Sequence, residues 1–354
     1  MPSAEITSYL HKCVQKGKAV HYLPPYRPEH KLKLMDWLGI PPTRQEGSVP
    51  FIRAVIAQRN YKSAEEIVEI EKACDVTADM HITAMKVLRP GMYEYEVVAE
   101  MNRVAESNNC QLSFATIATI NGQTLHNHYH GNKVKPGDLF LIDAGAEVES
   151  GYAGDMSSTI PADKKFTARQ REVYEIQNAM HLESVKALCP GIPYMEVYEL
   201  SARVMVDGMK ALGLMKGNAE DAVREGAHAL FYPHGLGHMM GLDVHDMENL
   251  GEIWVGYNGQ PKSTQFGRKS QRLAIPLEPG FVHTVEPGIY FIPELIDMWK
   301  GEKKFTDFIN YDVVETYKDF GGIRNEEDYL ITETGARRLG KKIPLTPEEV
   351  EALR

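Results

Sequence analysis

The sequence predicts an α+β fold built from two similar halves. Two stretches that lie 100 residues apart, 85–105 and 185–205, share eight of 21 positions, where ordinary residue usage gives about one or two. Each stretch holds a Pro-Gly pair between two helical patterns, and strand-like segments follow both of them. A duplicated helix–helix–strand unit explains these observations, and duplicated halves usually place a ligand site between them. Two unrelated helix–Pro-Gly–helix turns are the alternative.

The composition is that of a globular, acidic protein. The 354 residues are 43% apolar and 25% charged, which is enough for a sizeable core, and the net charge is −10. Negative charge repels nucleic-acid phosphates and anionic lipids, so we expect no nucleic-acid and no membrane partner. No apolar run is long enough to cross a membrane, and the N-terminus has no apolar signal core. Four scattered cysteines without a CxxC motif favour a reducing, cytoplasmic location.

Residues 1–60 differ from the rest of the chain. Six prolines lie between positions 24 and 50, and only Glu29–Leu38 has a clear helical pattern. So little regular structure makes a poor independent domain. We therefore expect an N-terminal arm over residues 1–60, the remnant of a truncated domain, followed by a catalytic domain over residues 61–354.

The first half opens with a long helix. Ser63 is its predicted N-cap, and Glu65 and Glu66 follow in the first turn, where the helix dipole favours carboxylates. Pro90-Gly91 ends this helix near Arg89. The pattern then predicts a second helix and three strands, over Tyr95–Ser107, Phe114–Ile120, Asp138–Val148 and Met156–Ile160.

The second half repeats this order. Helical patterns cover 167–188 and 195–213, and residues 230–334 are strand-like, with loops expected at 248–272 and 294–308. The pattern predicts a short acidic helix over Thr346–Arg354, because Pro347 suits the first helical turn.

Two aspartates stand where neighbouring strands could bring them together. Asp143 ends an apolar strand, and Asp155 lies twelve residues further on, at the start of the next strand. A buried carboxylate without a partner is costly, and two adjacent carboxylates repel each other unless they share a proton or a cation. Each aspartate taken alone could instead be a turn or N-cap residue.

Further candidate ligands follow in the second half. A glycine-rich stretch holds three histidines, His234, His238 and His245, which is unusual for histidines that only fill a core. Glu286 ends an apolar strand before a Pro-Gly turn, and Glu326 lies in Gly321–Asp328, which could also be a solvated acidic turn.

A competing cluster lies in the first half. His126, His128 and His130 alternate, so on a strand they would share one face and could hold zinc or a similar metal. The surrounding asparagines and glycine fit a surface turn equally well. The sequence has no HExxH, Walker A or GxSxG motif, and Gly235–Gly241 is one residue too long for GxGxxG.

Taken together, the motifs PHGLGHMMGLDVHD, LEPGFVHTVEPGIYF and GGIRNEED resemble the metallopeptidase family with the pita-bread fold, over about residues 62–345. They are most similar to its proline-specific branch, the Xaa-Pro aminopeptidases and prolidases. The resemblance implies the pita-bread (creatinase/aminopeptidase) fold, with two pseudo-symmetric α/β halves around a mostly antiparallel curved sheet. It also implies five metal ligands: Asp143, Asp155, His238, Glu286 and Glu326. Of these, Asp155 and Glu326 would be shared by two metal ions.

The same resemblance assigns other residues to the site. It implies that His126, His234 and His245 line the active site, and that Arg324 supports the metal ligands. Arg272 would hold the free carboxylate of a substrate, as an arginine does in prolidase. Four carboxylates and one imidazole suit two divalent ions, and we expect Mn²⁺ in preference to Co²⁺, Fe²⁺ or Zn²⁺. Glu286 could serve as the base towards water, and His245 could bind the tetrahedral intermediate.

The sequence therefore predicts a two-metal exopeptidase that acts on short proline-containing peptides and hydrolyses the bond between an N-terminal residue and a following proline. An Xaa-Pro dipeptidase (prolidase) is one alternative. A catalytically silent binding scaffold and a metal-free, creatinase-like hydrolase on the same fold are two others. The resemblance is also compatible with a homodimer.

Overall fold

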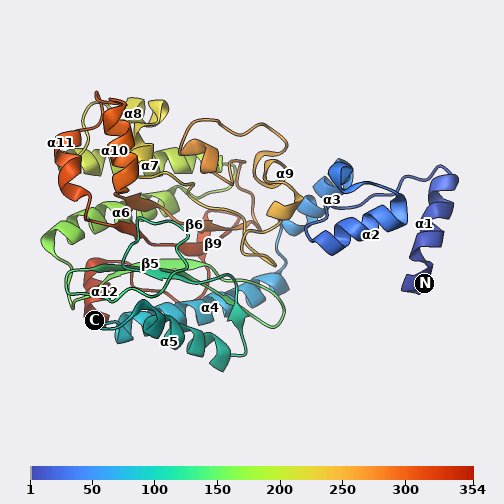
Figure 1. The fold of residues 1–354 in the computed structure, drawn as a ribbon, viewed down its shortest axis with the longest axis horizontal. Helices are drawn as coiled ribbons and strands as arrows, with labels where there is room; N and C mark the ends of the chain where they lie inside the picture. Colours follow the sequence, from blue (N-terminus) through green and yellow to red (C-terminus); the bar gives the residue numbers. More distant parts are fainter. Residues whose placement is uncertain (1) are drawn as a thin grey trace. The chain divides into compact units, whose positions relative to one another are not determined.

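The computed structural model describes residues 2–354, and the chain divides into two compact units (Figure 1). The smaller unit contains the residues up to Tyr61 together with Met247–Pro261. The larger unit contains Lys62–Asp246 and Lys262–Arg354. That the N-terminal residues are the remnant of a truncated domain stays a prediction.

The smaller unit is helical. Its helix α2 confirms the helical pattern predicted at Glu29–Leu38, whereas two other helices in the first 60 residues were not predicted. Helix α3 packs on α9, where the Arg53 guanidinium lies 5.4 Å from the centre of the Trp254 ring. The helices of this unit are α1 (Ile6–Gln15), α2 (Pro28–Leu38), α3 (Val49–Arg59) and α9 (Glu252–Tyr257).

Two helix pairs carry the repeat in the larger unit. Helices α4 (Ala64–Val87) and α6 (Ala168–Ala187) end 100 residues apart, and helices α5 (Glu94–Ser107) and α7 (Tyr194–Ala211) begin 100 residues apart. The two connections also match, because Gly91 and Gly191 have φ of 97° and 88°, values that favour glycine. The capping box at Ser63 confirms the predicted start of α4.

Antiparallel strands lie between the helix pairs (Figure 1). One sheet has the order β2-β3-β5, a second has the order β6-β9-β10, and two short pairs, β1-β4 and β7-β8, flank them. Helix α4 packs against the first sheet and α6 against strands of the second half. The strands are β1 (Gln111–Leu112), β2 (Ile117–Thr119), β3 (Leu139–Ala144), β4 (Ala146–Glu147), β5 (Met156–Pro161), β6 (Val282–Val285), β7 (Gly288–Tyr290), β8 (Gly322–Arg324), β9 (Glu327–Ile331) and β10 (Ala336–Arg338).

The predicted strands of the first half exist with different bounds: two are shorter than predicted, and β5 extends one residue further, to Pro161. The strand expected at Asp138–Val148 is interrupted at Gly145, because its backbone approaches that of Gly154 so closely that a Cβ atom would lie 1.9 Å from the carbonyl oxygen. The interruption separates β3 from β4 and leaves Asp143 at the end of the first sheet.

The expected loop at 294–308 was wrong in part. Helix α10 (Pro293–Gly301) forms there, because Pro293 suits the first helical position and Ile296 and Trp299 bury one face. Trp299 packs edge-on against Phe305, with ring centres 5.4 Å apart. The remaining helices are α8 (Ala219–Glu225), α11 (Tyr311–Val314) and α12 (Pro347–Leu353), the last as predicted. No helix within residues 2–354 has the length and apolarity to span a bilayer.

Candidate metal centre

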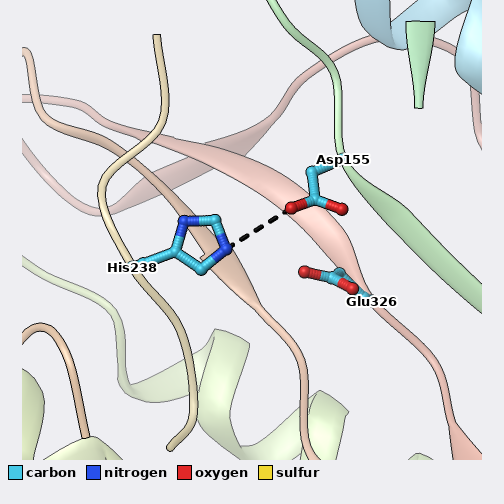
Figure 2. Close-up of side chains that lie close together, drawn as sticks. All are labelled: Asp155, His238 and Glu326. Atoms are coloured by element: carbon cyan, nitrogen blue, oxygen red, sulfur yellow. Dashed lines mark ion pairs between the residues drawn. The ribbon is translucent and has the colours of Figure 1, made fainter. Parts of the chain in front are cut away.

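Three side chains from distant parts of the sequence meet in the larger unit. One ligand atom from each of Asp155, His238 and Glu326 lies within 4.8 Å of the other two. The three residues are only 4%, 3% and 2% exposed. Figure 2 shows that their side chains point toward one another from three separate segments. In the part of the chain that the structure describes, this is the one such group of three or more potential ligands.

Asp155 is held by its backbone rather than by its carboxylate. It directly precedes β5, and its N–H donates to the buried Asp328 carboxylate over 3.0 Å. The Cys74 thiol donates to the same oxygen over 3.2 Å. The Oδ1 atom of Asp155 is buried and has no hydrogen-bond partner among the described residues. A buried carboxylate oxygen of this kind needs a proton or a cation.

Glu326 joins the two halves. It lies between β8 and β9, and its backbone N–H donates to the Ser157 carbonyl oxygen of β5 over 3.0 Å. The Ser157 hydroxyl donates to Glu326 Oε2 over 2.6 Å. Backbone and side chain therefore fix this carboxylate from the opposite half of the fold, next to Asp155.

The His238 ring directs its Nε2 atom at the carboxylates. Its Nδ1 lies 3.0 Å from the Met239 carbonyl oxygen, which can only accept, so Nδ1 carries the hydrogen. Nε2 then faces Asp155 Oδ2 at 3.4 Å and Glu286 Oε1 at 3.7 Å. A cation placed between Nε2 and these two carboxylate oxygens would be ligated by all three atoms. The donor set of oxygens and one imidazole therefore fits a divalent metal ion.

Asp143 lies at the end of β3 and is engaged by an arginine. Arg324 donates from Nη2 to Asp143 Oδ2 over 2.5 Å, from Nη1 to the Tyr290 hydroxyl over 2.7 Å, and from Nε to Ser157 Oγ over 2.9 Å. The Tyr290 hydroxyl in turn lies 2.9 Å from Nε2 of His234, whose Nδ1 donates to the Gly235 carbonyl. One hydrogen-bonded chain thus joins Asp143, Arg324, Tyr290 and His234.

The other predicted site residues surround this chain. The His245 ring lies against the His238 ring, with centres 4.2 Å apart. His126 is exposed, and partial desolvation and the Arg324 charge lower the pKa of its ring, with a smaller contribution from Arg272. His128 and His130 instead contact the Thr116 carbonyl, and no third ligand joins them within residues 2–354.

Three residues of this arrangement were not anticipated. Tyr290 and Asp328 lie inside the motifs quoted above, close in sequence to Glu286 and Glu326. This closeness could have marked them as residues of the site. The sequence gives no such signal for Ser157, because the hydroxyl of a serine in a buried strand usually just finds a hydrogen-bond partner and has no further role. Its partners are 167 and 169 residues away.

Burial and mutual repulsion dominate the electrostatics of the cluster. Desolvation and the Asp143 charge raise the pKa of Asp155 to about 8. Desolvation raises the pKa of Glu286, and desolvation with the Asp155 charge raises that of Glu326 well above its usual range. Desolvation lowers the pKa of His234 to about 3, so this histidine is neutral at physiological pH. Binding divalent cations would relieve the repulsion among the carboxylates.

These shifts predict an unusual pH dependence for protein stripped of divalent ions. Carboxyls with a raised pKa hold more protons in the folded than in the unfolded state, so stability falls as pH rises from about 4 towards the folded pKa values. Buried histidines with a lowered pKa act in the opposite direction, so the carboxyl contribution is isolated by comparison with E326Q, which keeps those histidines. Relative to E326Q, chelated protein should lose at least about 2 kcal/mol of unfolding free energy between about pH 5 and pH 8. Denaturant unfolding with EDTA measures this difference, and added Mn²⁺ should reduce it. Chelated protein that gains stability relative to E326Q over the same range would contradict the assignment.

Comparison with known proteins places the chain in a family. The sequence pattern of metallopeptidase family M24 matches residues 68–333. The Xaa-Pro aminopeptidase of Escherichia coli (strain K12) is 38% identical over 300 residues, which cover 83% of this chain and 59% of that protein. The human Xaa-Pro dipeptidase is 32% identical over 306 residues, which cover 84% of this chain and 60% of that protein. The chain thus spans about 60% of the length of these relatives.

Solved structures agree with the sequence comparison. Pseudomonas aeruginosa aminopeptidase PepP superposes with a TM-score of 0.79 at 30% identity, covering 100% of this chain and 74% of that one. A variant of Escherichia coli aminopeptidase P in complex with substrate gives 0.78 at 33% identity, covering 99% and 73%. These similarities confirm the predicted pita-bread fold. From the matched residues 68–333 and the fold that they adopt, we conclude that the chain belongs to metallopeptidase family M24.

Proposed function

We propose that this chain is a two-metal exopeptidase that hydrolyses the bond between an N-terminal residue and a following proline, that is, an Xaa-Pro aminopeptidase. The observation that carries the proposal is the buried cluster of Asp155, His238 and Glu326, with Glu286 3.7 Å from the histidine. The similarity to Xaa-Pro aminopeptidase and to Xaa-Pro dipeptidase supports the same substrate class.

Five side chains would hold the ions. Asp155, His238 and Glu326 form the buried centre, and Glu286 and Asp143 flank it. We infer Mn²⁺ as the metal, because a set rich in carboxylate oxygens and without thiolates suits this ion. When bound, two such ions supply Lewis-acid polarisation of the scissile carbonyl and lower the pKa of a water nucleophile.

The residues of this chain supply the proton transfers and the orientation. Glu286 is partly accessible, and burial raises its pKa, so its carboxylate is suited to take a proton from water and to pass it to the leaving proline nitrogen. His245 lies against His238, where it could donate a hydrogen bond to the tetrahedral intermediate. His234 stays neutral and is oriented by the Tyr290 hydroxyl. We infer that His234 and His126 line the pocket for the proline ring.

A dipeptidase is the second candidate. Arg272 is half-buried and its charge reaches His126, which would suit a clamp on the free carboxylate of an Xaa-Pro dipeptide. A cytoplasmic location is also part of the proposal. It rests on the reduced cysteines, since none of the four forms a disulfide within residues 2–354.

Parallel assays on Ala-Pro and Ala-Pro-Ala with Mn²⁺ test the proposal, with Ala-Ala-Ala as the control substrate. We expect release of alanine from the tripeptide, no release from Ala-Ala-Ala, and loss of activity with EDTA. Cleavage of the dipeptide alone would replace the aminopeptidase by a prolidase and would support Arg272 as the carboxylate clamp. Protein that binds no metal and cleaves neither peptide would favour a binding scaffold instead.

A further inference from the structure

A buried glutamate outside the metal cluster fastens the loop that carries His126. Glu94 is the first residue of α5 and is 0% exposed. Its Oε1 accepts hydrogen bonds from the Ile120 N–H over 2.8 Å and from the Thr119 hydroxyl over 3.0 Å. Its Oε2 accepts from the Asn132 N–H over 3.2 Å, and the Asn132 amide group donates to both oxygens. One carboxylate therefore ties together the two ends of residues 119–132, here called the His126 loop.

The His126 loop begins at the first sheet. Thr119 ends β2, and two residues earlier Ile117 pairs with Asp143 in the register of β2 and β3. The other end of the loop runs along the start of α5, where the Glu94 N–H donates to the Asn132 carbonyl and the Tyr95 N–H to the His130 carbonyl. Residues 121–132 have no regular secondary structure, so these backbone bonds and the side-chain contacts of Glu94 contribute to their path.

His126 needs such a fixed path. Its φ is 55°, a left-handed conformation that is uncommon for residues other than glycine. Its side chain is exposed, and the charges of Arg324, Asp143, Arg272 and His245 act on the pKa of its ring; the first, second and fourth of these residues belong to the candidate metal centre. The loop thus holds an uncommon backbone conformation at the residue whose ring responds to these charges.

The second half of the repeat uses the same position in the same way. Tyr194 is the counterpart of Glu94 at an offset of 100 residues and is also the first residue of its helix, α7. The Tyr194 hydroxyl donates to the Thr284 carbonyl over 2.6 Å. Thr284 binds His238 through its backbone N–H and its hydroxyl. In each half, the first residue of the second helix thus binds a segment that carries or contacts a site residue, through the two ends of the His126 loop in one half and through Thr284 in the other.

We propose that Glu94 is a positioning residue for the substrate site, since its buried carboxylate holds the His126 loop in the conformation that places His126 beside the metal centre. The inference rests on the proposed function, because it assigns the His126 loop to the proline pocket. Glu94 touches neither the metal ligands nor the reacting atoms in this arrangement. Its removal should therefore leave the metal bound and impair substrate use.

Kinetics on Ala-Pro-Ala with Mn²⁺, for the full chain, test this inference. E94A should lower kcat/KM by about 10²-fold, because a shift of about 1 Å in a positioned group costs that much. E94Q keeps one acceptor oxygen but turns a donor towards the Asn132 N–H, so its loss should be smaller. E100A, on the same helix with a half-exposed side chain, is the matched control and should stay within about twofold.

A double-mutant cycle separates positioning from general destabilisation. If Glu94 acts through the His126 loop, E94A/H126A should be no worse than H126A, and E94A should change kcat and KM in the same proportion as H126A. Metal content should equal that of the unchanged protein, and hydrogen exchange should rise at the Ile120 and Asn132 amides. Additive losses, or loss of bound metal in both E94A and E94Q, would overturn the inference.

The same experiments distinguish the two proposals. If the unchanged protein with bound metal cleaves no Xaa-Pro peptide, the proposed function fails. In that case, amide hydrogen exchange alone tests the inference about Glu94. Faster exchange of residues 119–132 in E94A would support it, and unaltered exchange would overturn it. If the unchanged protein is active and E94A is equally active, the inference fails and the proposed function stands.

Discussion

Replacement of Glu326 by glutamine should abolish Xaa-Pro cleavage and yet stabilise the metal-free protein. Glutamine keeps the shape of the side chain and an oxygen for the Ser157 hydroxyl, but removes one charge from the cluster. Bound ions contribute several kcal/mol to transition-state stabilisation, so kcat/KM should fall by at least about 10³-fold. Bound Mn²⁺, measured by mass spectrometry of dialysed protein, should fall with it.

The gain in stability follows from the same removed charge. Burial and the nearby carboxylates raise the pKa of Glu326, so the metal-free fold must either take up a proton or tolerate repulsion. E326Q avoids that cost, and its unfolding free energy with EDTA should exceed that of the unchanged protein by about 2 kcal/mol near pH 7. E333Q, on an exposed neighbouring turn, is the control and should change neither quantity. An E326Q protein that binds metal and turns over normally would refute the assignment of Glu326.

Replacement of Lys62 by methionine should cause a large loss of stability. Lys62 Nζ lies 3.0 Å from Asp246 Oδ2, and the two side chains are 2% and 1% exposed. Removing one partner of a buried ion pair costs about 3–5 kcal/mol, because the remaining buried charge loses that compensation. For a protein of this size, we expect the melting temperature to fall by about 5 °C.

The pair also fixes the segment that carries the site histidines. The Asp246 N–H donates to the Met239 carbonyl, which closes the turn from His238 to His245. Gly241 allows the approach, since a Cβ atom there would lie 2.9 Å from Asp246 Oδ2. K62M should therefore also lower kcat/KM, because the turn loses its anchor.

Two further variants make this prediction specific. K62M/D246N removes both charges and should recover most of the lost stability. K186M breaks an ion pair in which the lysine is 68% exposed, and it should cost less than about 0.5 kcal/mol. Equal losses in K62M and K186M, measured by denaturant unfolding, would show that burial does not govern the Lys62 pair.

Local sequence signals were sufficient for the elements of the larger unit. Ser63 and the acidic first turn specify the start of α4, and a Pro-Gly pair ends both α4 and α6, because capping and dihedral preferences act within a few residues. Because these signals are local, they also explain why the loop predicted at 294–308 was wrong. There Trp299 stabilises helix α10 through ring contacts with Phe266 and Phe305 that no periodicity reveals.

The sequence by itself provided the candidate metal ligands, the aspartate pair from the cost of adjacent buried carboxylates and the full set of five from its resemblance to a known family. Only the tertiary structure decided how they are used. Arg324 engages Asp143 from 181 positions away, and Lys62 pairs with Asp246 across 184. No sequence signal distinguished Glu94, which lies one residue before the predicted helix, yet its carboxylate holds a loop 25 to 38 residues further on. Such partners depend on distances that the folded backbone sets, and hydrogen bonds and ion pairs act only over a few ångströms.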